Sequence, residues 1–232
     1  MSLLYVMRHG QASFGQDNYD RLSGLGQEQA RLTGQHLAGL GAAFDAAFCG
    51  AMARQQDTAR NVLQGLADPP ELEVLPGFNE FDSDAIIRAL LPAMRAEEPL
   101  VEQAAPMMFC DRRAFQVVYG EAMRRWLSGR HDQGLPETWL QFLERIARTL
   151  DQVRGANPRG KRVIVFTSGG PISAIMSQAL NLDHETAMRL TWVIKNASLS
   201  RFLYNQSDFS LSLFNSTVHL ETQGQAELIT YR

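Results

Sequence analysis

The sequence has few cysteines, little net charge and no long apolar run. Its two cysteines, Cys49 and Cys110, exclude a disulfide scaffold and a four-thiolate zinc site. The net charge of -3, from 22 basic and 25 acidic residues, argues against binding of an extended polyanion, so no nucleic-acid partner is expected. No apolar run approaches the roughly 18 residues that span a membrane, so no membrane partner is expected either.

The first ten residues lack the features of a secretory signal. They contain neither a basic start nor an adequate apolar stretch. Hydrophobic residues make up 45% and charged residues 20% of the chain, which is ordinary globular composition and excludes disorder as the main state. We therefore expect a cytoplasmic protein, and 232 residues suit a single domain with a large core.

Strand-like and helix-like segments alternate along the chain. Every residue of 163–166 is apolar, as in a central strand buried on both faces. Alternation predicts an α/β fold: a three-layer sandwich in which helices flank a mostly parallel central sheet. The expected strands are 3–7, 44–49, 72–75, 163–166, 199–204 and 209–214, the last two forming a C-terminal antiparallel hairpin. The expected helices are 23–40, 52–66, 139–153 and one that opens at Gly169.

The stretch 82–136 has no clear strand pattern. It reads as helical in pieces, interrupted by Pro92, Pro99 and Pro106. We expect residues 1–232 to form one domain that contains 82–136 as a helical insertion, acting as a lid over the site. The C-terminal hairpin offers an edge for pairing with a second copy, so a homodimer stays open.

Two tripeptides follow expected strands at the carboxyl edge, where ligands bind in open α/β sheets. In the first, Arg8-His9-Gly10, a neutral imidazole is a nucleophile, an arginine fork suits phosphoryl oxygens, and glycine admits a close anion. An ordinary strand exit is the competing interpretation. The second is Ser168-Gly169-Gly170, at the start of a helix.

Two further residues suit the same chemistry. Arg54 lies early in the helix after the second expected strand, where the helix N-terminus also attracts anions. Glu80 is a carboxyl group that could protonate a leaving oxygen, with Asp82 and Asp84 as nearby competitors. Taken singly, each also fits a solvated surface position.

Together these motifs resemble the histidine phosphatase superfamily, also called the phosphoglycerate mutase-like fold. The family pattern orders five elements: Arg-His-Gly; Leu-Thr/Ser-x-x-Gly-x-x-Gln-Ala; Ser-x-x-x-Arg-Ala-x-x-Thr-Ala; Leu-x-Glu; and Ser-His-Gly-Gly. This chain has, in order, Arg8-His9-Gly10, Leu22-Ser-Gly-Leu-Gly-Gln-Glu-Gln-Ala30, Gly50-Ala-Met-Ala-Arg-Gln-Gln-Asp-Thr-Ala59, Phe78-Asn-Glu80 and Thr167-Ser168-Gly169-Gly170. The resemblance covers residues 3–202 apart from the insertion.

The resemblance implies a two-step phosphoryl transfer. His9 would attack phosphorus, Arg8 and Arg54 would hold the equatorial oxygens, and Glu80 would protonate the leaving alcohol and then activate water. The resemblance implies no metal and no organic cofactor.

Ser168 stands where the family pattern has its second histidine. Serine can donate a hydrogen bond to the phosphoryl group but is shorter and neutral, and losing one preorganised donor lowers rates on the order of 10²–10³-fold. Three interpretations follow: a working variant, a weakened enzyme, or an anion-binding pseudo-enzyme. Of the other histidines, only His131 is a candidate replacement; the sequence gives no such role to His36, His184 or His219.

We therefore expect a metal-independent phosphatase that hydrolyses a small phosphorylated metabolite through phosphohistidine on His9. The alternatives are a phosphotransferase of the phosphoglycerate mutase type and a catalytically impaired phosphate-binding protein. The expected substrate-binding residues are Gly10, Ser13, Arg21, Ser168 and Gly169.

Overall fold

The computed structural model describes residues 1–13 and 20–231, which fold as two compact units. The first unit comprises Met1–Glu80 and Arg145–Arg232, and the second comprises Phe81–Glu144. The first contains a six-stranded sheet of order β3-β2-β4-β1-β5-β6. Its strands are β1 (Ser2–Arg8), β2 (Ala46–Cys49), β3 (Leu72–Val74), β4 (Arg162–Thr167), β5 (Leu199–Tyr204) and β6 (Phe209–Ser216).

The sheet is parallel in one part and antiparallel in the other. Strands β3, β2, β4 and β1 pair in parallel, whereas β5 runs antiparallel to both β1 and β6. This arrangement confirms the predicted α/β fold with its C-terminal antiparallel hairpin. β1 lies between the two parts, with Tyr5 opposite Ile164 of β4 on one side and Arg201 of β5 on the other.

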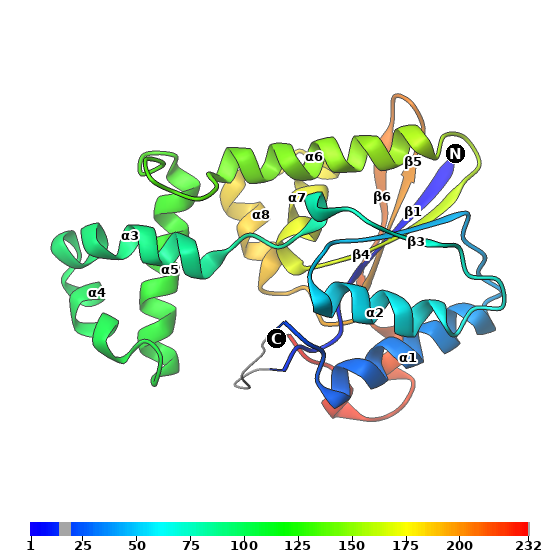
Figure 1. The fold of residues 1–232 in the computed structure, drawn as a ribbon, viewed down its shortest axis with the longest axis horizontal. Coiled ribbons are helices and arrows are strands. Elements are labelled where there is room, and N and C mark those ends of the chain that lie inside the picture. The colour runs from blue at the N-terminus through cyan, green and yellow to red at the C-terminus, as the bar shows by residue number, and fades with distance from the viewer. Residues whose placement is uncertain (14–19, 232) are drawn as a thin grey trace. The chain divides into compact units, whose positions relative to one another are not determined.

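Helices of the first unit cover both faces of the sheet (Figure 1). They are α1 (Gly24–Gly39), α2 (Ala53–Leu63), α7 (Gly169–Leu180), α8 (His184–Thr191), the short α9 (Val218–Glu221) and the C-terminal part of α6 (Trp139–Ala156), with 3-10 turns η1 (Pro76–Phe78) and η3 (Ala226–Leu228). Ser23 begins α1 because its hydroxyl accepts the Gly26 N–H at 3.0 Å, a standard N-cap.

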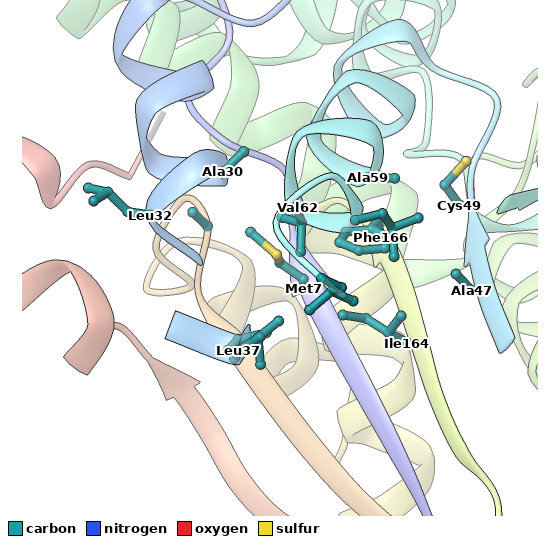
Figure 2. Close-up of a cluster of buried hydrophobic side chains, with 14 of the residues drawn as sticks. Met7, Ala30, Leu32, Leu37, Ala47, Cys49, Ala59, Val62, Ile164 and Phe166 are labelled. Carbon is teal, nitrogen blue, oxygen red and sulfur yellow. The ribbon is translucent and has the colours of Figure 1, made fainter. Parts of the chain in front are cut away.

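The core beneath α1 and α2 follows from strand alternation. Met7, Ile164 and Phe166 point to this face of the sheet and pack with Leu37 of α1 and Val62 of α2 (Figure 2). The intervening residues of β1 and β4 point to the opposite face, and they too are fully buried: Leu4, Val6, Val163 and Val165. Because both faces are packed, the carboxyl ends of β1 and β4 are held in fixed positions in the sheet.

The second unit is helical. Its elements are α3 (Ser83–Glu97), α4 (Pro99–Ala104), the 3-10 turn η2 (Ala105–Met107), α5 (Arg112–Ser128) and the first residues of α6. An aromatic cluster of Phe81, Trp126, Trp139 and Phe142 lies within it. The stretch 75–161, all of it described, contains no strand. The expected bounds of the insertion, 82–136, and its role as a lid stay predictions.

Two expected elements extend at least two residues beyond the observed ones. The expected strand at 44–49 begins only at Ala46, because Phe44 is buried by packing edge-on against the Tyr5 ring rather than by strand pairing. The expected helix at 52–66 ends at Leu63, since the chain turns at Gly65, where a Cβ would lie 2.9 Å from the Gly34 carbonyl carbon. In both places, apolar side chains continue beyond the end of the helix or strand, which is why the pattern predicted longer elements.

Candidate active site

The carboxyl ends of three parallel strands meet at one edge of the sheet. His9 follows β1 and donates its backbone N–H to the Thr167 carbonyl of β4 at 2.8 Å. Gly50 follows β2 and donates to the Phe166 carbonyl at 3.2 Å. The segments after β1, β2 and β4 are therefore neighbours, and the sequence motifs that follow these strands come together.

The His9 ring is buried and held in one tautomer. Its side chain is 5% exposed, and Nδ1 lies 2.7 Å from the Gly10 carbonyl oxygen. Since a carbonyl can only accept, Nδ1 carries the proton and Nε2 carries the lone pair. Burial, with the charges of Arg54 and Arg8, holds the pKa of His9 well below its ordinary value of 6.5. The ring is therefore neutral at pH 7.

Arg54 lies beside the His9 lone pair. Its Nε–H donates to His9 Nε2 at 3.2 Å, and its side chain is nearly buried. Its Nη1 forms an ion pair with Asp20 at 2.8 Å. Asp20 also accepts the N–H of Ala53, the first residue of α2, at 2.9 Å. One carboxylate thus contacts both the guanidinium and the positive end of the helix dipole.

Arg8 is the last residue of β1 and immediately precedes His9. Its Nη1 donates to the backbone carbonyls of Ile194 and, at 2.9 Å, Tyr231. A Cβ on Gly169 would lie 3.9 Å from Arg8 Nε, an ordinary contact distance, so this guanidinium lies beside the start of α7. The charge of Arg8 helps to lower the pKa of His9. Both expected arginines are therefore near the ring.

Glu80 reaches the N-terminus of α7. Its Oε2 accepts the backbone N–H of Gly170 at 3.0 Å, where a helix favours a negative group. Arg145 fixes the preceding turn by donating to the carbonyls of Gly77 at 2.8 Å and Asn79 at 3.0 Å. The side chain predicted as acid and base is thus on the same sheet edge as the segment after β4.

Gly10 allows the His9 loop to press against α1. A methyl group on Gly10 would overlap the Gly26 carbonyl, and one on Gly26 would overlap the Gln11 carbonyl. The Gly10 N–H donates to Thr58 Oγ1 at 3.0 Å, and that hydroxyl donates to the Arg54 carbonyl at 2.7 Å. Two glycines and one threonine therefore set the position of His9 relative to α2.

Ser168 is the N-cap residue of α7 and is 1% exposed. Its hydroxyl makes no cap hydrogen bond to the helix. Instead, Ser168 Oγ accepts a hydrogen bond from Gln55 Nε2 at 2.8 Å. Gln55, which follows Arg54 on α2, is fully buried.

Ser13 and Arg21 lie at the two ends of the segment 14–19, which is outside the described residues. The Ser13 N–H donates to the Arg21 carbonyl at 2.8 Å, and the Arg21 side chain is exposed. Their expected contacts with substrate stay a prediction. The neighbouring Asp20, rather than Arg21, is the residue that touches Arg54.

The other histidines have different surroundings. His219 is 2% exposed, with Nε2 3.1 Å from the Ala197 carbonyl, and its ring packs 5.5 Å from that of His36. Burial first and the charge of His36 second lower its pKa to about 4. His184 is exposed on α8, and His131 belongs to the second unit. The role of His131 as a replacement stays a prediction.

The described part of the chain has neither a metal-binding cluster of side chains nor a membrane-spanning helix. Across residues 1–13 and 20–231, no group of three or more His, Cys, Asp or Glu side chains could hold a metal ion. Over the same residues, no helix combines the length and apolar character that crossing a membrane requires.

Sequence reasoning missed Asp20, Gln55 and Thr58. Thr58 had a signal, because it is the threonine of the quoted Arg-Ala-x-x-Thr-Ala pattern. Gln55 had one also, because it stands at the alanine of that pattern. Asp20 had none, since it lies 34 residues from Arg54 in the sequence and belongs to none of the quoted motifs.

Comparisons with known proteins give the same family as the motifs. A family model for the histidine phosphatase superfamily (branch 1) matches residues 4–105 and 110–217. A 2,3-bisphosphoglycerate-dependent phosphoglycerate mutase from Parvibaculum lavamentivorans is 24% identical over 199 residues, covering 82% of this chain and 85% of the relative.

Solved structures agree on the fold. A mutant phosphoserine phosphatase from Entamoeba histolytica, in complex with phosphoserine, aligns with a TM-score of 0.67 at 18% identity, covering 95% of this chain and 100% of that one. A phosphoglycerate mutase from Bacillus anthracis aligns with a TM-score of 0.65 at 17% identity, covering 97% of each chain. At these identities the likeness shows the fold alone.

Proposed function

The chain belongs to the histidine phosphatase superfamily, and from that premise we propose that it is a metal-independent phosphomonoesterase acting through phosphohistidine on His9. The state of the His9 ring carries the proposal. Its Nδ1 proton is held by the Gly10 carbonyl, so the Nε2 lone pair faces the guanidinium of Arg54. A neutral imidazole with a directed lone pair beside a cation is suited to attack a phosphoryl group.

The reaction has two steps. First, His9 Nε2 forms a bond to phosphorus while the bond between phosphorus and the leaving oxygen breaks, and Glu80 gives that oxygen a proton. An alcohol leaves. Second, Glu80 takes a proton from water, the water oxygen bonds to phosphorus, and the bond to His9 breaks. Inorganic phosphate and unmodified His9 result.

The oxygens of the phosphoryl group need donors on both sides of His9. Arg54 and Arg8 supply charge, and the Ser168 hydroxyl and the backbone of Gly10 and Gly169 supply neutral contacts. Ser13 and Arg21 would contact the rest of the substrate. We propose a small phosphorylated metabolite, since the named relatives act in phosphoryl chemistry of that class and their names include phosphoserine and phosphoglycerate.

Trapping the phosphoenzyme tests the proposal. The protein is mixed with a generic aryl phosphate that carries a labelled phosphoryl group, and the reaction is quenched in alkaline detergent. We expect label that survives base and is lost in acid, as phosphohistidine is, and we expect none in the His9→Ala variant. Turnover without label on His9, or no turnover at all, would overturn the proposal.

A mutase is the second candidate, favoured by the 24% identical relative from P. lavamentivorans. In that case the phosphoryl group on His9 passes to a second hydroxyl rather than to water. Incubation with phosphoglycerate separates the two: isomerisation faster than release of inorganic phosphate supports the mutase, and release without isomerisation supports the phosphatase.

A phosphate-binding protein without turnover is the third candidate, since a serine stands at position 168 and Asp20 already neutralises Arg54. It predicts binding of inorganic phosphate in a calorimeter and no hydrolysis of any phosphate ester.

A further inference from the structure

We propose that Gln55 is a positioning residue: its side-chain amide holds Ser168 so that the serine hydroxyl directs its proton to a bound phosphoryl group. Catalysis by this site rests on the proposed function, but the hydrogen-bond arrangement can be tested without turnover.

The two side chains meet inside the protein. Gln55 is fully buried on α2, and Ser168 is 1% exposed at the end of β4. Gln55 Nε2 lies 2.8 Å from Ser168 Oγ and 3.2 Å from the Phe78 carbonyl oxygen. The amide therefore has one neighbour whose role is fixed, the carbonyl, and one that could donate or accept, the hydroxyl.

The carbonyl decides which way the amide points. A carbonyl oxygen can only accept, so the atom of Gln55 that faces Phe78 must be the nitrogen. The Phe78 carbonyl also accepts from Thr167 Oγ1 at 2.6 Å, which uses its second lone pair. The amide nitrogen has two protons, and Phe78 and Ser168 take one each. Ser168 Oγ must therefore accept.

The Ser168 proton is then directed elsewhere. In the described part of the chain, Ser168 Oγ donates to no acceptor, and it does not cap α7. Its neighbours in sequence are at the site: the Thr167 carbonyl holds the His9 N–H, and Gly169 lies against Arg8. The acceptor that this position lacks is an anion beside His9, and a phosphoryl oxygen provides one.

Gln55 lowers the stability of the fold at this position. Its Oε1 is buried without a hydrogen-bond partner, which destabilises a protein. A side chain on Gly50 would overlap that oxygen while Gln55 keeps this position. Gly50, Gln55 and Ser168 stand where the quoted family pattern has serine, alanine and histidine. Gln55 thus adjoins both other departures from the pattern, the backbone of Gly50 and the hydroxyl of Ser168, as expected of a set that functions together.

A double-mutant cycle tests the proposal. The variants are Ser168→Ala, Gln55→Met and both together, and kcat and KM are measured with a generic aryl phosphate. We expect each single variant to lower kcat roughly 10- to 100-fold, with little change in KM. The double variant should be no slower than Ser168→Ala, because Gln55 acts only through the serine. Effects that multiply, or full activity in Gln55→Met, overturn the proposal.

Methionine keeps the volume of glutamine and removes the unpaired oxygen. We therefore expect the thermal midpoint of Gln55→Met to be unchanged or higher while kcat falls, a combination that a structural role does not give. A midpoint that falls in step with activity overturns the proposal. Gln56→Met is the matched control: Gln56 is the next glutamine of α2, it donates to the Ala51 carbonyl at 2.8 Å, and its replacement should leave kcat unchanged.

The same cycle on inorganic phosphate separates this proposal from the proposed function. Dissociation constants are measured by calorimetry for all four proteins. Weaker binding in Gln55→Met that disappears in the Ser168→Ala background supports the positioning role even where the wild type hydrolyses nothing. Equal weakening in both backgrounds overturns it, as does an absence of phosphate binding by the wild type.

Discussion

Arg54 Nη1 lies 2.8 Å from a carboxylate oxygen of Asp20, so an arginine of the proposed phosphate site is already paired with a negatively charged side chain. The other Asp20 oxygen accepts the first N–H of α2. A phosphoryl dianion would use the same guanidinium and the same helix end. On the proposed function Asp20 would therefore compete with substrate for Arg54, which it holds in place through this ion pair.

Asp20→Asn should bind inorganic phosphate more tightly, on the order of five-fold. The variant removes a negative charge near the incoming anion and keeps an oxygen for the Ala53 N–H, and a part-exposed ion pair contributes less than about 1 kcal/mol. Calorimetry measures the affinity. Asp57→Asn, which removes a carboxylate paired with Arg60 on the same helix, is the control and should change little. Weaker phosphate binding by Asp20→Asn would instead show that Asp20 orients Arg54 for binding rather than competing with phosphate.

The His9 ring should stay neutral through mildly acidic solution. Burial and two nearby arginines hold its pKa well below 6.5, so its ring signals in an NMR titration should show no midpoint near pH 6.5, where an ordinary histidine titrates. Arg54→Gln should raise the pKa of His9, because it removes one of the two charges, while burial still keeps that pKa below the ordinary value. Comparison with His9→Asn assigns the signals. Titration of His9 near pH 6.5 in the wild type contradicts the geometry described.

His219 should make the fold sensitive to acid. The unfolded chain binds a proton at this histidine near pH 6.5, whereas burial delays protonation of the folded chain to about pH 4. The free energy of unfolding therefore falls as the pH drops from 6.5 to 4, by up to about 3 kcal/mol for this group. His219→Gln should lose less stability across that window, as measured by urea unfolding at pH 7 and pH 4.5. If both proteins lose the same free energy of unfolding between pH 7 and pH 4.5, His219 is not the source of the acid sensitivity.

Gly10→Ala should damage both stability and activity. Its methyl group would overlap the Gly26 carbonyl, which is backbone and cannot rotate away, and overpacking of this kind costs about 3 kcal/mol. His9 would shift with it. Gly24→Ala, in the same helix as Gly26 but with open space around the new methyl group, should change stability by less than about 1 kcal/mol. Urea unfolding and turnover of aryl phosphate report on each variant.

Restoring the family histidine should require two changes. Ser168→His alone places an imidazole ring in space that Gln55 already fills. We therefore expect the free energy of unfolding to fall by about 1–3 kcal/mol, with no gain in activity. Gln55→Ala together with Ser168→His returns the volume and restores both residues of the family pattern, so stability should recover. Thermal unfolding measures this rescue. A stable and more active Ser168→His single variant would show that the pocket is roomier than described.

Sequence periodicity was sufficient for most of the fold. The hairpin strand at 199–204 matches β5 residue for residue, because its apolar alternation reflects direct burial on one face. The predicted boundaries were wrong where a buried residue lies outside regular structure. Phe44 and Leu66 are both buried, but Phe44 precedes β2 and Leu66 follows α2. Such residues pack through turns, which period-based reasoning does not distinguish from element ends.

The placement of the candidate residues at one sheet edge was predictable, whereas their catalytic roles stay predictions. Arg8 ends β1, His9 follows it and Arg54 lies in the first turn of α2, and parallel topology brings such positions together. Relations between distant residues were not predictable. Asp20 on Arg54 and Gln55 on Ser168 depend on side-chain reach across the loop and across the sheet edge, at separations of 34 and 113 residues.

The place of β1 in the sheet also bears on when the proposed nucleophile reaches its final position during synthesis. β1 pairs with β4 and β5, so Leu3 meets Arg162 on one side and Leu203 on the other. At about 5–20 residues per second, a ribosome needs on the order of 10–40 s to add the 200 residues that separate Leu3 from Leu203. Within that interval β4 is synthesised first and β5 only at the end, so β1 gains its two neighbours one after the other, and such long-range pairing is slow to form. The segment that carries His9 is thus among the first synthesised and the last completed.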